Sequence, residues 1–492
     1  MSSALPRATF RDPAGSLSFE GDQAIRSIAP SARADVLDFL ESPLCQAMQQ
    51  RGDLIAAAID DSGPQLILRH PKIPIPTYPW EWTPAQWLAA ANLTLSLCDQ
   101  AIAAGWILKD ATPLNILFTG HRPIFVDILS FERINPARRN PDRRDPNPSI
   151  WLAYAQYVRT FLLPLLMDRL LHWPLSLSIF KRDGLEPAEC FAALPWRHRL
   201  SRAALWPITL PTLLERRKQT SAPAKIGAPP HSATPQKKSR PHDPELATHI
   251  LQRTLKDLRR LTLRATPQSA SSNWSDYPRT LTHYTPEQSQ QKLDWVRSIL
   301  ETTHPARVLD IGANTGDFSA LAASLGAEVV ALERDQASAD RLFRMARQRN
   351  LPILTIHADL ARPTPAAGWR NAESLSLLPR LDAKFDLVLM LAVIHHLLLM
   401  EQIPLPEILA LCHRLTRRHL VIEWVPVADP MFQSLLRGRD DLYGSLSEAD
   451  LISACAGRFH LLDRQPIANG RILLLFEKID PERTASDKIE EC

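Results

Sequence analysis

The segment 307–333 constrains the fold of this chain more than any other part. It runs Arg-Val-Leu-Asp-Ile-Gly-Ala-Asn-Thr-Gly-Asp-Phe, continues in a helical pattern and ends in Val-Val-Ala-Leu-Glu. This order predicts a buried strand, a glycine turn, a helix and a second strand that ends in a carboxylate. In an open parallel sheet, such a unit binds its ligand at the carboxyl ends of the strands. The pattern therefore predicts an α/β domain with a nucleoside-binding edge.

The turn between these elements favours one cofactor over another. Its sequence, Gly-Ala-Asn-Thr-Gly, lacks the third glycine of the dinucleotide fingerprint Gly-x-Gly-x-x-Gly, and Asp310 enters it. Gly312 and Gly316 are expected to let the backbone approach a ligand where a Cβ would collide. Glu333 is expected to accept hydrogen bonds from both hydroxyls of a ribose. These features point away from NAD and towards S-adenosylmethionine, and the segment resembles motif I of the class I methyltransferases.

The rest of the C-terminal half follows the same order of elements. Further strands are predicted at 353–356, 385–390 and 419–424, with a final antiparallel pair at 459–463 and 471–476. Strands that alternate with helical patterns favour a doubly wound sheet. The predicted class is α/β, with a C-terminal Rossmann-like, seven-stranded class I methyltransferase domain. An α+β domain is expected to precede it.

The resemblance to class I methyltransferases implies a set of cofactor contacts. Residues around the turn would surround the methionine and ribose, one carboxylate would bind the ribose, another would face the adenine amino group, and a backbone position after the fourth strand would contact the methionine part. These positions are Asp310, Gly312, Asn314, Gly316, Glu333, Asp359 and Leu391. For Asp359 the alternative is a helix N-cap or turn residue.

Three residues are candidates for catalysis. His395 and His396 follow the fourth strand, at the point that faces the transferred methyl group in class I folds. A neutral imidazole there can take a proton from a hydroxyl, carboxyl or amine, although such a pair also occurs at the head of a helix without acting as a base. Glu423, at the end of the fifth strand, is the third candidate, and its alternative role is to pair with an arginine. The chain lacks the Asn-Pro-Pro-Tyr sequence of enzymes that methylate exocyclic base nitrogens.

Several short sequences together resemble a narrower group. They are Asn-Trp-Ser-Asp-Tyr from residue 273, Gly-Ala-Asn-Thr-Gly-Asp-Phe-Ser, Ala-Gly-Trp-Arg-Asn, Leu-Ala-Val-Ile-His-His-Leu and Glu-Trp-Val-Pro-Val-Ala-Asp-Pro-Met. This combination resembles the NoeA-like methyltransferases, a bacterial group named for a nodulation protein. The insertion 363–380, with Trp369, Asn371 and Glu373, is expected either to form part of a substrate lid or to pack a tryptophan over the sheet.

The N-terminal half carries a second pattern. Asp110, Asn115 and Asp127 have the order and nearly the spacing of the catalytic loop and metal-binding aspartate of protein kinases and aminoglycoside phosphotransferases. Arg26 stands where the ATP-binding lysine would be, Lys109 replaces the usual residue before the first aspartate, and no glycine-rich phosphate loop precedes them. Three interpretations stay open: active phosphotransfer with Mg-ATP, a kinase-like binding or regulatory module, and an unrelated fold.

Composition predicts the domain boundaries and the cellular compartment. We expect an N-terminal module at 1–215, a basic proline-rich linker at 216–244, the methyltransferase domain at 245–480 and a tail at 481–492. Scattered cysteines without metal-ligand spacing, together with the absence of a signal-peptide run, favour a reduced, cytoplasmic protein. Because the apolar stretch 151–180 contains prolines and charged residues, we expect it to form a core helix rather than a membrane span. A peripheral membrane contact stays open.

The expected function is transfer of a methyl group from S-adenosylmethionine to an oxygen or nitrogen nucleophile. The acceptor is expected to be a small molecule, a glycan or a natural-product scaffold rather than nucleic acid, because no arginine-rich, aromatic-interleaved face is apparent. The alternatives are an ATP-dependent phosphotransferase or nucleotide-binding regulatory protein that uses the Asp110, Asn115 and Asp127 loop, and a scaffold that binds S-adenosylmethionine without turnover. No metal site is expected.

Overall fold

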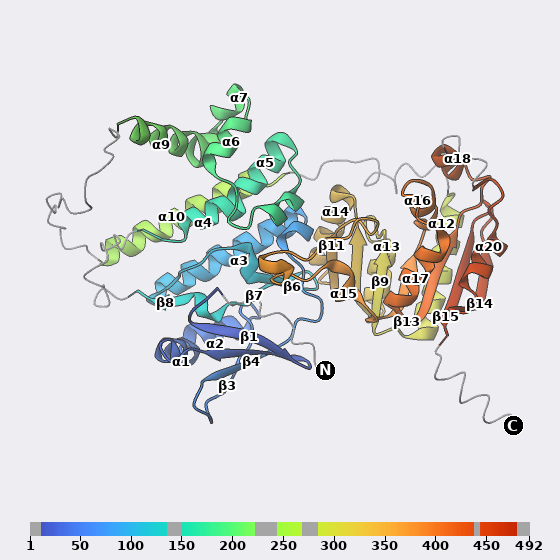
Figure 1. The fold of residues 1–492 in the computed structure, drawn as a ribbon, viewed down its shortest axis with the longest axis horizontal. Coiled ribbons are helices and arrows are strands. Elements are labelled where there is room, and N and C mark those ends of the chain that lie inside the picture. Colours follow the sequence, from blue (N-terminus) through green and yellow to red (C-terminus); the bar gives the residue numbers. More distant parts are fainter. Residues whose placement is uncertain (1–10, 135–149, 222–243, 268–283, 437–442, 480–492) are drawn as a thin grey trace.

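The computed structural model of the chain describes residues 11–134, 150–221, 244–267, 284–436 and 443–479. Within these ranges an N-terminal module and a C-terminal α/β domain lie side by side, as Figure 1 shows. The Asn-Trp-Ser-Asp-Tyr sequence that begins at residue 273 lies outside the described residues.

A twisted sheet forms the centre of the C-terminal domain. In the described part of the chain it has seven strands in the order β11-β10-β9-β12-β13-β15-β14, and β15 runs antiparallel to both β13 and β14. The strands are β9 Arg307–Ile311, β10 Glu328–Glu333, β11 Ile353–His357, β12 Phe385–Met390, β13 Thr416–Trp424, β14 Phe459–Pro466 and β15 Ile472–Lys478. This arrangement confirms the predicted Rossmann-like class I fold.

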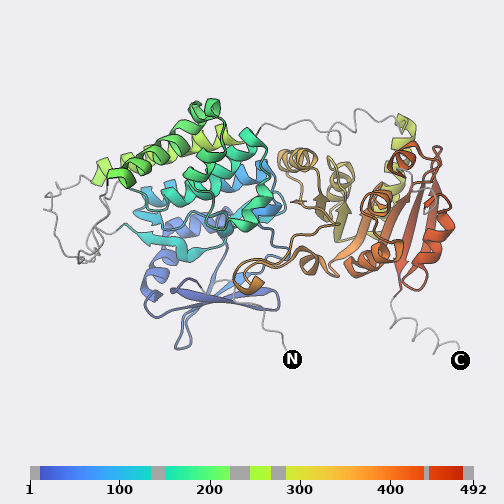
Figure 2. The same cartoon turned by 45° about the horizontal axis from the view of Figure 1, so that its top comes forward.

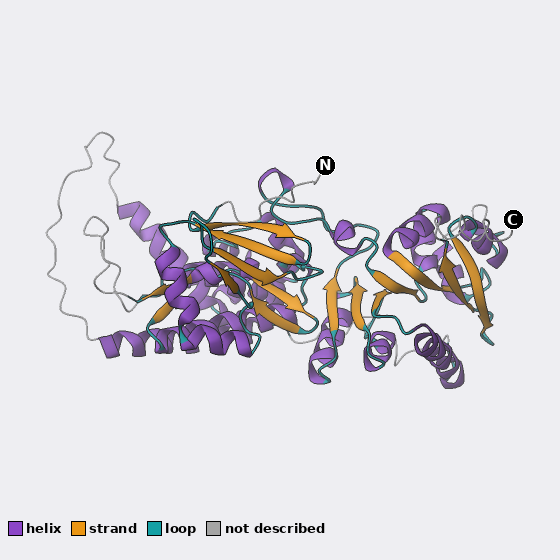
Figure 3. Ribbon diagram, turned by 90° about the horizontal axis from the view of Figure 1, so that it is seen from below, coloured by secondary structure: helices purple, strands orange, loops and turns teal. Residues whose placement is uncertain are grey.

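Helices cover both faces of this sheet because alternate strand residues point to opposite sides. Val308 packs under α12 and α13, whereas Leu309 and Ile311 belong to the core under α16 and α17. The helices are α12 Pro286–Thr303, α13 Asp317–Ser324, α14 Gln336–Gln348, α15 Leu377–Leu381, α16 Ile394–Leu399, α17 Leu405–Leu415, α18 Pro430–Leu436 and α20 Glu448–Cys455. Figure 3 shows this sheet and the smaller N-terminal sheet as two separate sheets next to each other.

The N-terminal module combines small antiparallel sheets with a larger helical part. Its described strands form a sheet in the order β1-β2-β4-β3 and the pairs β5-β8 and β6-β7. They are β1 Gly15–Glu20, β2 Gln23–Ile28, β3 Ala58–Asp60, β4 Ile67–Pro71, β5 Trp106–Leu108, β6 Ile116–Thr119, β7 Arg122–Phe125 and β8 Phe131–Arg133. This is the α+β architecture expected of the N-terminal half.

One long helix, α3, is the axis of that module. It begins with a capping box between Thr83 and Gln86, has Pro84 as its first residue, and is buried over most of its surface. Helix α3 spans Pro84–Ala103, and the other described α-helices are α1 Arg33–Glu41, α2 Pro43–Gln50, α4 Tyr154–Tyr157, α5 Leu163–Leu171, α6 Pro187–Ala193, α7 Trp196–Arg199, α8 Arg202–Ala204, α9 Leu210–Ser221 and α10 Pro244–Ala265. Short 3-10 or π turns include η1 Pro79–Glu81, η2 Pro113–Asn115, η3 Ile128–Ser130, η4 Val158–Leu162, η5 Leu175–Phe180 and η6 Leu205–Thr209.

The position of α10 corrects the expected domain boundary. This helix packs against α3 and α5 of the N-terminal module, and the hydroxyls of Tyr157 and Thr262 lie 2.9 Å apart in a buried contact. The methyltransferase domain therefore does not begin at residue 245. Likewise, α9 continues through the start of the predicted linker to Ser221, whereas residues 222–243 lie outside the described part. An amphipathic pattern predicts that a helix buries one face, but not against which module.

The two modules share a continuous interior. A chain of edge-to-face aromatic rings runs from Trp82, just before α3, through Phe118 to Phe343 of α14. The ring centroids of Trp82 and Phe118 lie 5.1 Å apart, and those of Phe118 and Phe343 lie 5.9 Å apart. Gln86 Nε2 donates to the Thr355 carbonyl of β11 at 3.0 Å, and the amide of Ala85 donates to Asp340 at 2.7 Å. The sequence predicts two domains, and the structure adds that they are joined by buried contacts.

The apolar stretch 151–180 lies in the core of the N-terminal module. It forms α4, η4, α5 and η5, and Tyr157, Phe161 and Leu166 are fully buried. Among the described residues, no helix is both long enough and apolar enough to cross a membrane.

Candidate active site

The predicted glycine turn after β9 has a left-handed backbone at three positions. Gly312 and Gly316 have φ of +71° and +93°, and Asn314 between them has φ of +49°. A Cβ on Gly312 would collide with Cγ2 of Val393, in the loop that leads into α16, and one on Gly316 would lie 2.7 Å from Cγ of Leu342. The backbone at both glycines therefore lies close to other parts of the domain, and the close approach to a ligand stays a prediction. Both glycines let the turn fit against the edge of the sheet.

Glu333 ends β10 directly beside this turn. Its carboxylate accepts hydrogen bonds from the backbone amides of Asn314 at 2.8 Å and Asp335 at 2.7 Å. Burial raises the pKa of Glu333, and the amide bonds partly offset that effect. Asn314 Oδ1 is also buried and accepts no hydrogen bond from the described residues. The turn thus holds a carboxylate in a set orientation next to an unsatisfied acceptor.

The remaining predicted cofactor residues take different positions around this edge. Asp310 is buried and accepts a 2.6 Å hydrogen bond from Ser319, which ties β9 to α13, and burial raises its pKa to about 6. Asp359 follows β11, accepts from the amide of Ala361 at 2.9 Å and pairs with Arg362 at 3.1 Å. These contacts match the turn role that the sequence left as the alternative. Leu391 directly follows β12 and is buried.

The two histidines begin α16 at the same edge of the sheet. Their rings lie 4.2 Å apart, but their surroundings differ. Burial and the charges of His396, Arg471 and Lys292 hold the pKa of His395 well below its usual value. Its Nδ1 is buried without a hydrogen-bond partner among the described residues, whereas Nδ1 of His396 lies 3.3 Å from Met400 Sδ. Burial likewise lowers the pKa of His396 to about 4. Both imidazoles are therefore neutral at physiological pH.

Glu423 lies at the centre of a buried ionic cluster. Its carboxylate contacts Lys292 Nζ at 2.5 Å, Arg471 Nη1 at 3.3 Å and the hydroxyl of Tyr284, while Arg471 Nε also bonds Asp429 at 2.8 Å. Burial by itself would raise the pKa of Glu423, but the two cations outweigh it and lower that pKa. The structure thus shows the pairing with an arginine that the sequence offered as the alternative role.

Sequence reasoning missed the partners of Glu423. Tyr284 lies just before α12, Lys292 lies in the second turn of α12, and Arg471 directly precedes β15. Lys292 and Arg471 were not identified because a single basic residue in a helix or before a strand is ordinarily solvent-exposed. The available signal was that both positions lie next to predicted apolar faces, where a charge needs a partner.

The insertion 363–380 connects the domain to the N-terminal module. Glu373 bonds Arg11 at 2.5 Å and Arg182 at 2.8 Å, while Trp369 is 64% exposed and thus does not pack over the sheet. At its end, the buried guanidinium of Arg380 bonds the buried carboxylate of Glu81. The alternative of a structural tryptophan over the sheet is therefore wrong, and Glu373 anchors the insertion to the other module.

The predicted N-terminal loop residues come together, with both oxygens of Asp127 engaged. Arg26 Nη1 donates to Oδ1 at 2.9 Å, and Ser130 Oγ donates to Oδ2 at 2.6 Å. Asn115 Nδ2 donates to Ser130 Oγ at 3.2 Å, and burial raises the pKa of Asp110. Among the described residues no group of three histidine, cysteine, aspartate or glutamate side chains is placed to hold a metal ion. Arginine thus supplies the positive charge beside Asp127.

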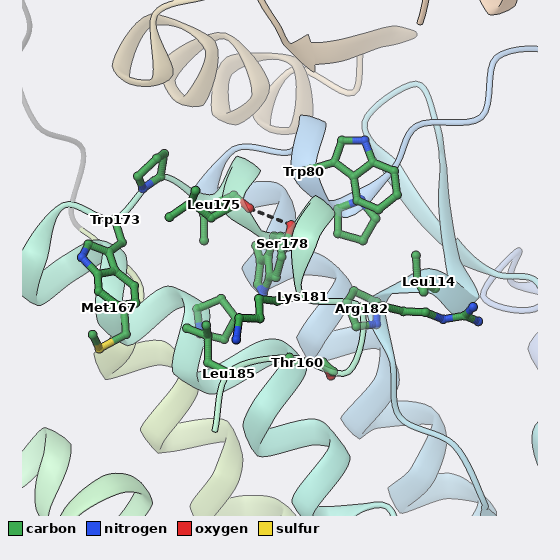
Figure 4. Close-up of a pocket in the computed structure, with 17 residues that line it drawn as sticks. Trp80, Leu114, Thr160, Met167, Trp173, Leu175, Ser178, Lys181, Arg182 and Leu185 are labelled. Carbon is green, nitrogen blue, oxygen red and sulfur yellow. Dashed lines mark hydrogen bonds between the residues drawn. The ribbon is translucent and has the colours of Figure 1, made fainter. Parts of the chain in front are cut away.

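A separate pocket lies in the N-terminal module, as Figure 4 shows. Trp80, Trp173, Met167, Leu175 and Leu185 line it together with several prolines. The two basic side chains in its lining are already paired: Lys181 with Glu189 at 2.6 Å and Arg182 with Glu373 at 2.8 Å. The pocket is apolar and aromatic, with no unpaired charge to select a ligand.

The C-terminal domain is a class I methyltransferase domain: residues 309–419 match the family described as methyltransferase domain. Over nearly its whole length the chain is similar to nodulation protein NoeA of Rhizobium meliloti (strain 1021), with 28% identity across 486 residues, 96% of this chain and 95% of that protein. The resemblance to the NoeA-like methyltransferases is therefore confirmed.

Solved structures of methyltransferases also match the chain. The N-methyltransferase NodS from Bradyrhizobium japonicum WM9 is 14% identical, with a TM-score of 0.30 over 40% of this chain and 98% of that one. Magnesium protoporphyrin IX methyltransferase from Synechocystis PCC 6803, solved with bound S-adenosylmethionine, is 16% identical, with a TM-score of 0.27 over 43% and 87%.

Proposed function

We propose that the chain transfers a methyl group from S-adenosylmethionine to an oxygen or nitrogen nucleophile of a small-molecule, glycan or natural-product acceptor. The observation that carries this proposal is the Glu333 carboxylate, held by two backbone amides beside the left-handed turn at 312–316. A carboxylate with free lone pairs in this place can accept from two ribose hydroxyls. The unsatisfied Asn314 Oδ1 adds an acceptor for the same ligand.

The side chains at this edge would mainly position the reactants. S-adenosylmethionine supplies an activated methyl group with a neutral leaving group, so alignment and exclusion of water provide most of the acceleration. His395 is neutral and buried, and its ring can accept the proton that a hydroxyl or amine nucleophile loses. The Glu423 cluster would fix Tyr284, Lys292 and Arg471 as a wall of this site.

Replacing Glu333 with alanine tests the cofactor site. We expect the affinity for S-adenosylmethionine, measured by calorimetry, to fall at least ~10-fold because a buried charge-assisted acceptor is lost. Glu328→Ala is the matched control, since Glu328 begins the same strand but its side chain is exposed. Unchanged affinity in Glu333→Ala would contradict the proposed site. Binding without formation of S-adenosylhomocysteine from any acceptor pool would support the non-catalytic scaffold instead.

The neutral state of His395 predicts a pH profile. Because its pKa lies well below the usual value, the ring remains a proton acceptor as the pH falls through 6.5. We expect kcat/KM to stay level between pH 8 and 6, without the acid limb of an ordinary histidine base. His395→Gln should lower kcat by about 10²- to 10⁴-fold, whereas His396→Gln, which removes a ring already bonded to Met400, should have a smaller effect. Equal losses in the two variants would contradict the assignment of the base.

Phosphotransfer receives less support from the geometry. Both oxygens of Asp127 are bonded within the chain, one of them to Arg26. A titration with Mg-ATP, using Asp127→Ala as the comparison, distinguishes this function from methyl transfer. Mg-ATP binding that depends on Asp127, with no binding of S-adenosylmethionine, would place the chemistry in the N-terminal module.

A further inference from the structure

Helices α6, α7 and α9 form an outer edge of the N-terminal module, as Figures 1 and 2 show. Large apolar side chains are exposed along this edge. Trp196 and Trp206 are 71% and 68% exposed, and three leucines are also exposed. We call the set Trp196, Leu200, Trp206, Leu213 and Leu214 the α7–α9 face. Exposed tryptophans at these levels are unusual in a protein surface that contacts only water.

Contacts of two arginines with one aromatic ring join α6, α7 and α9. The guanidinium groups of Arg199 and Arg216 lie over the same ring, Phe191, at 4.3 and 5.1 Å from its centroid. Trp196 precedes Arg199 by three residues, and Leu213 precedes Arg216 by three, so each pair lies on one side of its helix. Trp206 lies in η6, which continues directly into α9. Phe191 of α6 therefore ties α7, which carries Trp196, to α9, which carries Leu213 and Leu214.

Positive charge predominates around this face, since Glu189 of α6 is paired with Lys181. From Cys190 to Arg217 the sequence contains five arginines and a single acidic residue, Glu215. Arg197, Arg202, Arg216 and Arg217 are exposed. Tryptophan prefers the boundary between water and acyl chains, and arginine is attracted to lipid phosphates. An apolar face bordered by arginines is complementary to an anionic lipid surface.

We propose that the α7–α9 face binds the surface of a bilayer that contains anionic phospholipids, with Trp196 and Trp206 inserted at the headgroup level. This inference is independent of the proposed methyl transfer, because it concerns residues of the N-terminal module alone. It also differs from the membrane contact left open for stretch 151–180, whose large side chains are mostly buried.

Flotation of the full-length protein with vesicles tests this proposal. One set of vesicles contains phosphatidylglycerol and phosphatidylcholine, and the other contains phosphatidylcholine alone. We expect binding to the anionic set only, weaker at high salt, and reduced roughly 10-fold in Trp196→Ser/Trp206→Ser. Trp369→Ser is the matched control, since that tryptophan is 64% exposed on the other domain. It should bind like the wild type.

Each other outcome overturns the proposal. Absence of binding to anionic vesicles, equal binding to both sets, or undiminished binding of the double variant would do so. Self-association of the wild type that the double variant abolishes, without vesicle binding, would show instead that the face contacts a second copy. Thermal unfolding of each variant checks the fold, which should be unchanged because both side chains are exposed.

Discussion

Gly312→Ala should abolish most of the affinity for S-adenosylmethionine. The φ of +71° disfavours any side chain by about 1–2 kcal/mol. In addition, the new Cβ would collide with Val393, whose branched side chain has little freedom to move. The turn at 312–316 must then shift relative to α16, and with it the amide of Asn314 that orients Glu333. We expect binding, measured by calorimetry, to weaken by ~10-fold or more.

Gly326→Ala separates the two causes. Gly326 has a comparable φ of +98°, but a Cβ there would meet nothing within 4 Å. Both variants should therefore lose stability through backbone strain, and only Gly312→Ala should lose the cofactor. If the two variants bind S-adenosylmethionine equally well, the contact between the turn and Val393 has no part in forming the site.

Removing either partner of the Glu81–Arg380 pair should destabilise the protein by about 3–5 kcal/mol. Both side chains are at most 1% exposed, so truncating one leaves the other charged, buried and without its counter-ion. The guanidinium also lies 4.8 Å from the centroid of the Tyr78 ring, which fixes it between the modules. Urea unfolding, followed for each module because two-state behaviour is not assured in a protein of this size, measures the loss.

Arg414→Ala is the control for that measurement. Arg414 pairs with Asp382, but both side chains are substantially exposed, so the expected loss is below about 1 kcal/mol. The double variant Glu81→Leu/Arg380→Met should be less destabilised than either single alanine variant because no charge is left unpaired. Single variants that behave like Arg414→Ala would show that the interface does not depend on this pair.

The fold of the C-terminal domain was predictable because its signals are local. Each buried strand is a short apolar run, and Gly312, Gly316 and Gly326 mark turns whose φ is positive. The helix at 286–303 follows from its capping residues, Thr285 and Gln288. Candidate residues that end strands, such as Glu333 and Glu423, follow from the same order, because the carboxyl ends of parallel strands meet at one edge.

Roles within the site were less predictable because they depend on partners far away in the chain. Glu423 was a candidate for catalysis, but Lys292 and Arg471, respectively 131 and 48 residues away in sequence, hold it as an ionised anchor. His395 and His396 look equivalent in the sequence. Their different burial and hydrogen-bonding partners distinguish them only in three dimensions.

The sequence by itself determined the α/β class, the succession of strands and helices in the C-terminal domain and the glycine turn after β9, because apolar periodicity and glycine positions encode backbone structure locally. Only the tertiary structure decided that α10 belongs to the N-terminal module, that Glu81 and Arg380 join the two modules, and that Arg26 neutralises Asp127. The sequence shows that an amphipathic helix needs a surface to pack against and that a buried charge needs a counter-ion. Which partner they find depends on packing between segments that are distant in the chain.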